Sequence, residues 1–195
     1  MKKSTIIIGL LLFVLLISSS VIAVIVFGNN PLARIGSDSN KLDWLMADIG
    51  GFGHPSSTDP LEVKLQNTAG RYVRLDDFRG KIVLLNFWTT WCPSCITEMP
   101  SMETLHRKLL GKNFAMVTVN IKESAAQVKA FFDRNKLSFA ALLDTTGEVS
   151  IEFGIRAIPT SFIIDKSGKI IGQISGPREW DSRKSVALFE QLADN

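Results

Sequence analysis

The chain has 195 residues, of which 46% are hydrophobic and 21% charged, and its formal net charge at pH 7 is +3. This composition supports a packed core and excludes a chain that is disordered throughout. Two of the positive charges are Lys2 and Lys3, and no basic run with interleaved aromatic residues follows them, so the sequence offers no case for nucleic-acid binding. Its two cysteines are too few for a disulfide-rich scaffold.

Residues 6–27 form an apolar run without charge, preceded by a short cytoplasmic N-terminus, residues 1–5, that carries the two lysines. A helix of this length would extend about 33 Å and could cross a hydrocarbon core of about 30 Å. Because positive charge tends to stay in the cytoplasm, the run predicts a single-pass signal-anchor in the cytoplasmic (inner) membrane, with the C-terminal domain on the extracytoplasmic, periplasmic side. A cleaved signal peptide stays open as an alternative, although its apolar core usually has about 7–15 residues.

Residues 28–58 are rich in Gly, Ser, Pro and Asp, which predicts a flexible tether. As a flexible coil, about thirty residues would reach about 30 Å root-mean-square. Within this range Trp44, Leu45 and Met46 suit a short docking turn, but a loosely ordered linker is the simpler interpretation.

Regular patterns begin at residue 59 and continue to residue 195, which predicts one α/β domain. The nearly continuous apolar run at 81–88 is typical of a central strand that is covered on both faces. The other expected elements, in chain order, are a hairpin at 61–65 and 71–75, a helix at 93–110, a strand at 114–119, a helix at 124–135, a short strand at 139–143, a short helix at 147–153, strands at 161–165 and 169–174, and a helix at 179–192. Their alternation predicts a central mixed sheet flanked by helices.

Both cysteines of the chain, Cys92 and Cys95, lie where the predicted central strand gives way to a helix. A structural disulfide here would close a very short loop and contribute only about 2 kcal/mol. A closed zinc site needs four ligands, and the chain has no second cysteine pair and only two histidines, His54 and His106. A redox dithiol is the favoured interpretation, because the N–H groups and dipole of a helix N-terminus stabilise a thiolate.

The position of each cysteine on the predicted helix suggests its role. Cys92 stands at the helix start, so we expect it to be the exposed nucleophile. Cys95 lies one turn further in and is expected to be covered. It would act as the resolving thiol, which breaks the mixed disulfide between Cys92 and a partner.

Residues 87–95, Phe-Trp-Thr-Thr-Trp-Cys-Pro-Ser-Cys, resemble the active site of the thioredoxin fold. The Glu-Met-Pro that follows at 98–100 resembles the TlpA/ResA-like branch of membrane-anchored thiol-disulfide oxidoreductases, within the redoxin/AhpC-TSA-like part of the thioredoxin superfamily. Residues 155–160, Ile-Arg-Ala-Ile-Pro-Thr, are similar to the loop that carries the cis-proline in this fold. The resemblance implies a thioredoxin-like fold with an N-terminal β-hairpin and a central helix-strand insertion.

The resemblance also implies site residues. It places a cis Ile158–Pro159 bond opposite the dithiol, where the Ile158 backbone would pair with an extended partner chain. An ordinary turn proline is the alternative. Trp91 would either shield the sulfurs or form an exposed contact surface. Glu98 would handle the proton of Cys95, because thioredoxin has a buried aspartate where this chain has Asn86, and an amide cannot accept that proton. A solvated helix-surface glutamate stays open as the alternative for Glu98.

The residues between the cysteines, Pro93 and Ser94, supply no positive charge, which predicts a low reduction potential and therefore a reductant. The resemblance implies reduction of disulfides in partner proteins, such as apocytochrome c during cytochrome c maturation, by a monomer without a further cofactor or metal. A membrane electron donor of the CcdA/DsbD type would recharge it. A thiol-disulfide oxidase, a thiol peroxidase and a non-enzymatic adaptor remain alternatives, although Leu85 stands where the peroxidase motif needs proline.

Overall fold

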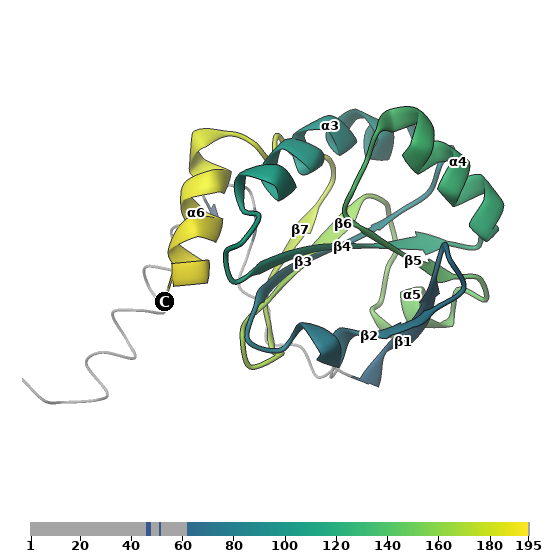
Figure 1. The fold of residues 1–195 in the computed structure, drawn as a ribbon, viewed down its shortest axis with the longest axis horizontal. Coiled ribbons are helices and arrows are strands. Elements are labelled where there is room, and N and C mark those ends of the chain that lie inside the picture. Colours follow the sequence, from purple (N-terminus) through teal and green to yellow (C-terminus); the bar gives the residue numbers. More distant parts are fainter. Residues whose placement is uncertain (1–45, 48–50, 52–61, 195) are drawn as a thin grey trace, which may run out of the picture. The chain divides into compact units, whose positions relative to one another are not determined.

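The computed structural model describes residues 46–47, 51 and 62–194 (Figure 1). Within them, seven strands form one mixed sheet in the order β2-β1-β5-β4-β3-β6-β7. The elements are β1 (Lys64–Asn67), β2 (Tyr72–Arg74), the 3-10 helix η2 (Leu75–Phe78), β3 (Ile82–Trp88), α3 (Pro93–Lys108), β4 (Phe114–Ile121), α4 (Ala125–Asn135), β5 (Ala140–Asp144), α5 (Glu148–Glu152), β6 (Thr160–Ile164), β7 (Ile170–Ser175) and α6 (Arg183–Asp194). The predicted α/β fold, with a mixed sheet and flanking helices, is confirmed.

The sheet combines parallel and antiparallel pairs around β3. This strand pairs in parallel with β4 and antiparallel with β6, and β4 pairs in parallel with β5. The hairpin of β1 and β2 joins the sheet through β1, which runs antiparallel to β5. The chain between β4 and β6 carries α4, β5 and α5, and β5 connects the N-terminal hairpin to the rest of the sheet.

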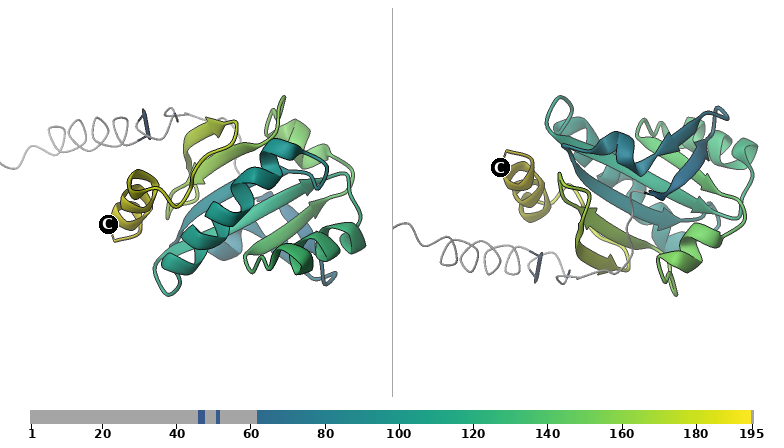
Figure 2. Two further views of the ribbon diagram at one scale, coloured as in Figure 1. Left: turned by 90° about the horizontal axis from the view of Figure 1, so that it is seen from above. Right: turned by 90° about the horizontal axis from the view of Figure 1, so that it is seen from below.

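The alternation of side chains along β3 divides the core into two layers. Val83, Leu85 and Phe87 point to the face on which α5 lies, where Phe87 packs against Phe153 with ring centroids 5.1 Å apart. The residues between them point to the opposite face, which α3 and α4 cover (Figures 1 and 2). On that face Trp88 is fully buried, and its ring lies 4.9 Å from that of Phe131 on α4. Asn86 shares this face with Trp88 and is therefore directed toward α3.

Two elements begin three or more residues later than the sequence predicted, and the other boundaries differ by at most two residues. The first strand begins at Lys64, three residues later than predicted, because its pairing with β2 starts with Lys64 opposite Arg74. The last helix begins at Arg183 rather than at residue 179. The Ser182 hydroxyl accepts a hydrogen bond from the Ser185 N–H at 3.2 Å, as an N-cap does. The residues before it form an irregular connection from β7, which ends in a turn closed by the Ser182 N–H and the Glu179 carbonyl oxygen at 3.2 Å.

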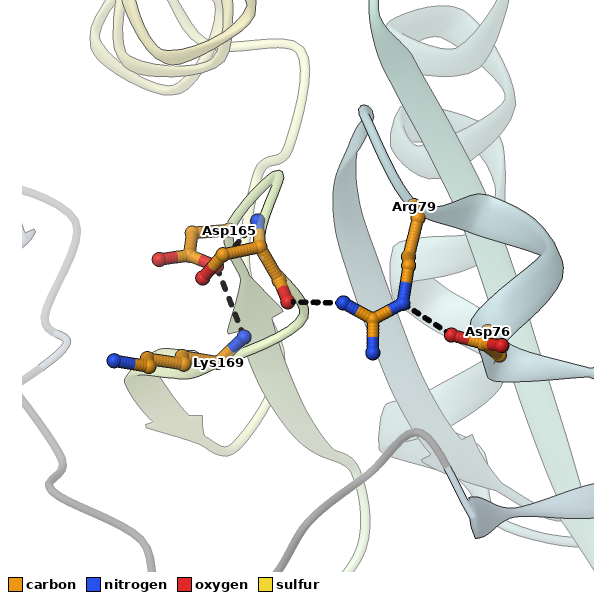
Figure 3. A network of polar contacts seen from close by, with 5 residues as sticks. Asp76, Arg79, Asp165 and Lys169 are labelled. Carbon is orange, nitrogen blue, oxygen red and sulfur yellow. Dashed lines mark hydrogen bonds and ion pairs between the residues drawn. The ribbon is translucent and has the colours of Figure 1, made fainter.

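A polar network joins the connection before β3 to the turn between β6 and β7 (Figure 3). Arg79 forms an ion pair with Asp76 and donates a hydrogen bond to the Ser167 carbonyl oxygen at 3.0 Å. In the turn itself, Asp165 Oδ1 accepts hydrogen bonds from the N–H groups of Ser167 and Lys169, each at 2.9 Å. The network lies on the surface and fixes one turn against another.

Two residues of the predicted tether are part of this domain. Met46 is fully buried, and the Gly51 N–H donates to its carbonyl oxygen at 2.8 Å. A Cβ added at Gly51 would lie 2.9 Å from Ile174 Cγ1, so the glycine lets the backbone approach β7 closely. Trp44 and Leu45 lie outside the described residues. So does the apolar segment 6–27, and no helix in the described ranges has the length and apolarity to span a membrane.

Candidate functional site

The cysteine pair stands at the junction of β3 and α3. Cys92 is the N-cap of α3, with extended backbone angles, and Pro93 occupies the first helical position, where the missing N–H costs nothing. Cys92 and Cys95 are joined in a disulfide. The Cys95 N–H points at Cys92 Sγ from 3.2 Å, and the Ser94 hydroxyl lies 3.3 Å from the same sulfur. These two donors, one of them an N–H of the first helical turn, are the groups that would stabilise a thiolate on Cys92.

The exposure of the two cysteines corrects part of the sequence prediction. Cys92 was expected to be exposed, but only 4% of its surface is accessible in this disulfide form, whereas Cys95 is fully buried. Ser94, the Ile158 carbonyl and Cys95 all lie close to Cys92 Sγ. The order of exposure is as expected. Trp91 is 70% exposed beside the pair, which fits a contact surface rather than a shield over the sulfurs.

The loop before β6 brings the proline to the cysteine pair. The Ile158–Pro159 bond is cis, as the sequence predicted. The Ile158 carbonyl oxygen lies 3.9 Å from Cys92 Sγ, Ile158 is half-buried, and Pro159 is buried. The Pro159 carbonyl oxygen accepts a hydrogen bond from the Gly176 N–H at 2.9 Å, which ties this loop to the end of β7. The structure therefore places Cys92, Ile158 and Pro159 together, from segments 66 residues apart.

Glu98 lies one helical turn beyond Cys95 and is 2% exposed, so the alternative of a solvated surface glutamate is wrong. Its Oε1 accepts a hydrogen bond from Asn86 Nδ2 at 2.8 Å. Its Oε2 accepts from Trp180 Nε1 at 2.9 Å and from the Arg178 N–H at 3.2 Å. Asn86 also donates to Ser161 Oγ at 2.9 Å, which fixes the orientation of the amide. These contacts hold the carboxyl group between helix α3 and the face of the sheet that α3 covers.

Burial dominates the electrostatics of Glu98. Removal of the carboxyl from water raises its pKa from the ordinary value of 4.5 to about 7, against the smaller lowering effects of its three hydrogen bonds and of the Arg178 charge. A carboxyl group with this pKa exchanges a proton near neutral pH, as a general acid or base must. Three residues along the helix from Cys95, the site thus holds a carboxyl group whose pKa is raised to about 7 by burial.

The connection between β7 and α6 contributes a site residue that the sequence did not indicate. Trp180 was predicted to lie in the last helix, whereas it is fully buried in this connection and donates to the Glu98 carboxyl group, 82 residues earlier. Ser101 ties this connection to α3, because its hydroxyl accepts a hydrogen bond from the Trp180 N–H at 3.1 Å. No local pattern signals such a long-range contact. A tryptophan in a Gly-Pro-containing segment before a polar helix start was the one available hint.

The candidate metal ligands do not gather at the site. His106 lies on α3, where its ring packs edge-on against Phe139 at 6.1 Å, and His54 lies outside the described residues. Among residues 46–47, 51 and 62–194, no three His, Cys, Asp or Glu side chains are arranged to hold a metal ion. The chemistry of the site is that of a sulfur pair and a buried carboxyl group.

The chain is similar to thiol-disulfide oxidoreductases of bacteria. The protein ResA of Geobacillus thermodenitrificans is 39% identical over 120 residues, which are 62% of this chain and 68% of that relative. ResA of Bacillus thuringiensis subsp. konkukian is 41% identical over 107 residues, or 55% of this chain and 62% of the relative. The chain thus spans slightly less than two thirds of the length of some of the relatives that it matches.

Solved structures agree with these relatives. StoA of Bacillus subtilis is 30% identical with a TM-score of 0.56, over 64% of this chain and 95% of that chain. A thioredoxin-family thiol:disulfide interchange protein of Chlorobium tepidum is 26% identical with a TM-score of 0.60, over 72% of this chain and 99% of that chain. The AhpC/TSA family model matches residues 59–173, more than half of the 195 residues. The chain therefore belongs to the AhpC/TSA family.

Proposed function

We propose that this chain is a thiol-disulfide oxidoreductase that reduces disulfides in partner proteins. The observation that supports this most directly is the convergence of three groups: a disulfide at the N-terminus of α3, the cis-proline loop 3.9 Å from Cys92 Sγ, and the buried Glu98 on the same helix. The named activities of ResA, a thiol-disulfide oxidoreductase, and of the thiol:disulfide interchange protein of Chlorobium tepidum agree with this assignment.

In the first step, the reduced protein meets the disulfide of a partner. The thiolate of Cys92 attacks one partner sulfur, so that a bond forms between Cys92 Sγ and that sulfur while the partner disulfide breaks. The second partner sulfur leaves as a thiolate and takes up a proton. The Ser94 hydroxyl and the Cys95 N–H, both beside Cys92 Sγ, favour the thiolate that starts this step.

In the second step, Cys95 resolves the mixed disulfide. The Cys95 thiol transfers its proton to the Glu98 carboxylate, and the resulting thiolate attacks Cys92 Sγ. The bond between Cys92 and the partner breaks, and the partner sulfur leaves as a thiolate that takes up a proton from water, while Glu98 releases the proton that it accepted. Two electrons have then passed from the cysteine pair to the partner, and the Cys92–Cys95 disulfide of this structure is restored.

The electron supply and the location follow from the same proposal. A dithiol donor must reduce the Cys92–Cys95 disulfide again, and a membrane protein of the CcdA/DsbD type would suit a chain anchored by residues 6–27. Apocytochrome c on the extracytoplasmic side is the proposed substrate, within cytochrome c maturation. The absence of a cationic side chain at Pro93 and Ser94 supports a reductant, with a potential nearer to about −270 mV than to about −120 mV.

Trapping of the mixed disulfide tests the proposal. A Cys95→Ala variant cannot resolve the intermediate, so partners should accumulate on Cys92 as adducts that reductant releases and mass spectrometry identifies. The matched control is the double variant Cys92→Ser, Cys95→Ala, which should trap nothing. Two results in cells that need the protein would contradict the proposal and favour a non-enzymatic adaptor. One is that Cys95→Ala traps no adducts, and the other is that a double Cys→Ser variant keeps full activity.

A further inference from the structure

Two connections meet at one edge of the sheet beside the cysteine pair. Strands β3 and β4 are parallel and in register, with Trp88 opposite Asn120, so the segments that follow them emerge at the same edge. The segment after β3 is 89–91 and leads into Cys92. The segment after β4 contains Lys122, whose φ of 58° turns the chain sharply, and then Glu123 before the N-cap of α4.

The Glu123 carboxylate joins these two connections. It is 8% exposed and accepts a hydrogen bond from the Thr90 N–H at 2.7 Å and another from the Thr90 hydroxyl at 2.5 Å. The Asn120 side-chain amide donates to the same carboxylate at 2.7 Å, which orients it from β4. Both polar groups of Thr90 that can donate are therefore used by one carboxylate from another part of the chain.

Burial fixes the start of the segment at Thr89, which is 2% exposed, but polar contacts other than those to Glu123 add little to it. The hydrogen bond from the Cys92 N–H to the Thr89 carbonyl oxygen is long, at 3.5 Å. The Thr89 hydroxyl is buried and has no hydrogen-bond partner among the residues that the structure describes. Trp91 is 70% exposed, so packing against the domain contributes little to its position. The Glu123 contacts to Thr90 therefore fix the backbone from which the Trp91 indole projects.

We propose that Glu123 is a positioning residue, which holds Thr90 and so presents Trp91 as a fixed platform beside Cys92 to a protein substrate. The inference rests on the proposed function and adds a determinant of its selectivity. A partner polypeptide must lie across the surface around Cys92, and a fixed aromatic side chain reduces the cost of ordering that surface on binding. A small disulfide needs only access to the sulfur, so it should not depend on the platform.

The hydrogen-bond pattern allows geometry to be separated from charge. In a Glu123→Gln variant the amide oxygen can accept from the Thr90 N–H and Asn120, and the NH₂ group can donate to the Thr90 hydroxyl, which also accepts. The contacts can therefore survive without the negative charge. In Glu123→Ala all three are lost. If position matters, glutamine should restore what alanine removes.

Single-turnover reduction of two probes by the full-length, pre-reduced chain tests the inference. Insulin serves as the protein disulfide and oxidised glutathione as the small one. We expect Glu123→Ala to lower the rate constant with insulin about tenfold, in keeping with the effect of a small misplacement of a binding group, and to leave the glutathione rate within about twofold. Glu123→Gln should keep both rates close to those of the wild type. Because the chain has four tryptophans, 5-fluorotryptophan labelling is needed to isolate Trp91. Its ¹⁹F NMR signal, assigned by a Trp91→Phe variant, should show faster local motion in the alanine variant only.

Glu103 offers a matched control. Its carboxylate is also 8% exposed and accepts hydrogen bonds from the N–H and hydroxyl of one residue, Ser138, at 2.8 and 2.7 Å, but it lies further along α3 and does not hold the segment beside Cys92. Glu103→Ala should leave the ratio of insulin to glutathione rates unchanged. Should Glu123→Ala fail to fold, Thr90→Val removes one of the two Thr90 donors and should shift the ratio in the same direction, with Thr90→Ser as its control.

The outcomes distinguish this inference from the proposed function. If the wild type reduces neither probe, the proposed function fails. If the wild type reduces both and the ratio of rates is the same in Glu123→Ala, or in Thr90→Val where the alanine variant does not fold, the positioning role is refuted while the oxidoreductase stands. An equal drop of the insulin-to-glutathione rate ratio in Glu103→Ala would also refute it. The effect would then follow from the loss of any buried carboxylate that bonds to another segment of the chain.

Discussion

Helix α3 carries two buried glutamates five positions apart, and their surroundings give them opposite chemistry. Glu103 forms an ion pair with Arg107 at 2.6 Å. Burial works to raise its pKa, but the hydrogen bonds from Arg107 and Ser138 outweigh burial and hold the pKa below the ordinary value. Glu98 accepts its hydrogen bonds from neutral groups, namely the Asn86 amide, the Trp180 indole and a backbone N–H, and burial raises its pKa to about 7.

The comparison shows what makes a buried carboxyl group a proton carrier. Burial alone acts on both glutamates in the same direction. A hydrogen-bonded guanidinium helps to lower the pKa of Glu103 and keeps it an anion at neutral pH, whereas neutral donors orient Glu98 without fixing its charge. Only the second can take a proton from a thiol at neutral pH and return it. The carboxyl group near Cys95 has the surroundings that the proposed reaction needs.

The largest expected difference between Glu98 and Glu103 is their effect on the rate at which Cys95 resolves the mixed disulfide. In Glu98→Gln no carboxylate is available to accept the Cys95 proton, so release of a trapped partner from Cys92 at pH 7 should slow by about 10²–10⁴-fold, the usual contribution of a general base. Glu103→Gln should change this rate less than about threefold. Stopped-flow measurement of partner release from a preformed mixed disulfide compares them. Equal rates in the two variants would contradict the role of Glu98.

How far this site could be predicted depends on whether its determinants are local. The strand-to-helix junction, the cysteine pair and the cis-proline follow from short motifs, and the sequence placed all of them correctly. Glu98 could be assigned to the same helix, but its burial could not be derived, because it depends on Trp180 and on a connection that a helix was predicted to occupy. The bonds of Glu123 likewise join residues 33 apart, and no pattern within either segment announces them.

The pH dependence of stability should also differ in sign between the two glutamates. Because the folded protein binds the Glu98 proton more tightly than the unfolded chain does, its contribution is complete below pH 4.5 and falls as the pH rises to about 7, by about 3 kcal/mol in all. The lowered pKa of Glu103 has the reverse effect, so its stabilisation is present at neutral pH and is lost in acid, below the ordinary value of 4.5.

Denaturant unfolding of the disulfide form, repeated across pH 3 to 8, measures both contributions. Glu98→Gln should remove the fall between pH 4.5 and 7 and leave the loss in acid unchanged. Glu103→Gln should remove the loss in acid and leave the fall between pH 4.5 and 7 unchanged. A fall near neutral pH that persists in Glu98→Gln would mean that another group carries it.

The smallest expected effect is that of a Trp180→Phe variant on the difference in pKa between Glu98 and Glu103. The phenyl ring keeps most of the packing against Phe189, whose ring lies 6.3 Å away, but the N–H donor to Glu98 Oε2 is lost. Since that hydrogen bond stabilises the carboxylate, its loss should raise the pKa of Glu98 further, by about one pH unit for a hydrogen bond to a charged acceptor.

NMR of glutamate with a labelled carboxyl group, recorded across the pH range, measures the pKa of Glu98 directly, and the Glu103 signal provides the internal control. If the Glu98 midpoint stayed near 7, burial alone would set it and the neutral donors would serve only to orient the group. If the Glu103 midpoint moved as well, the two carboxyl groups would be coupled along α3, and the contrast in their surroundings would no longer explain their difference.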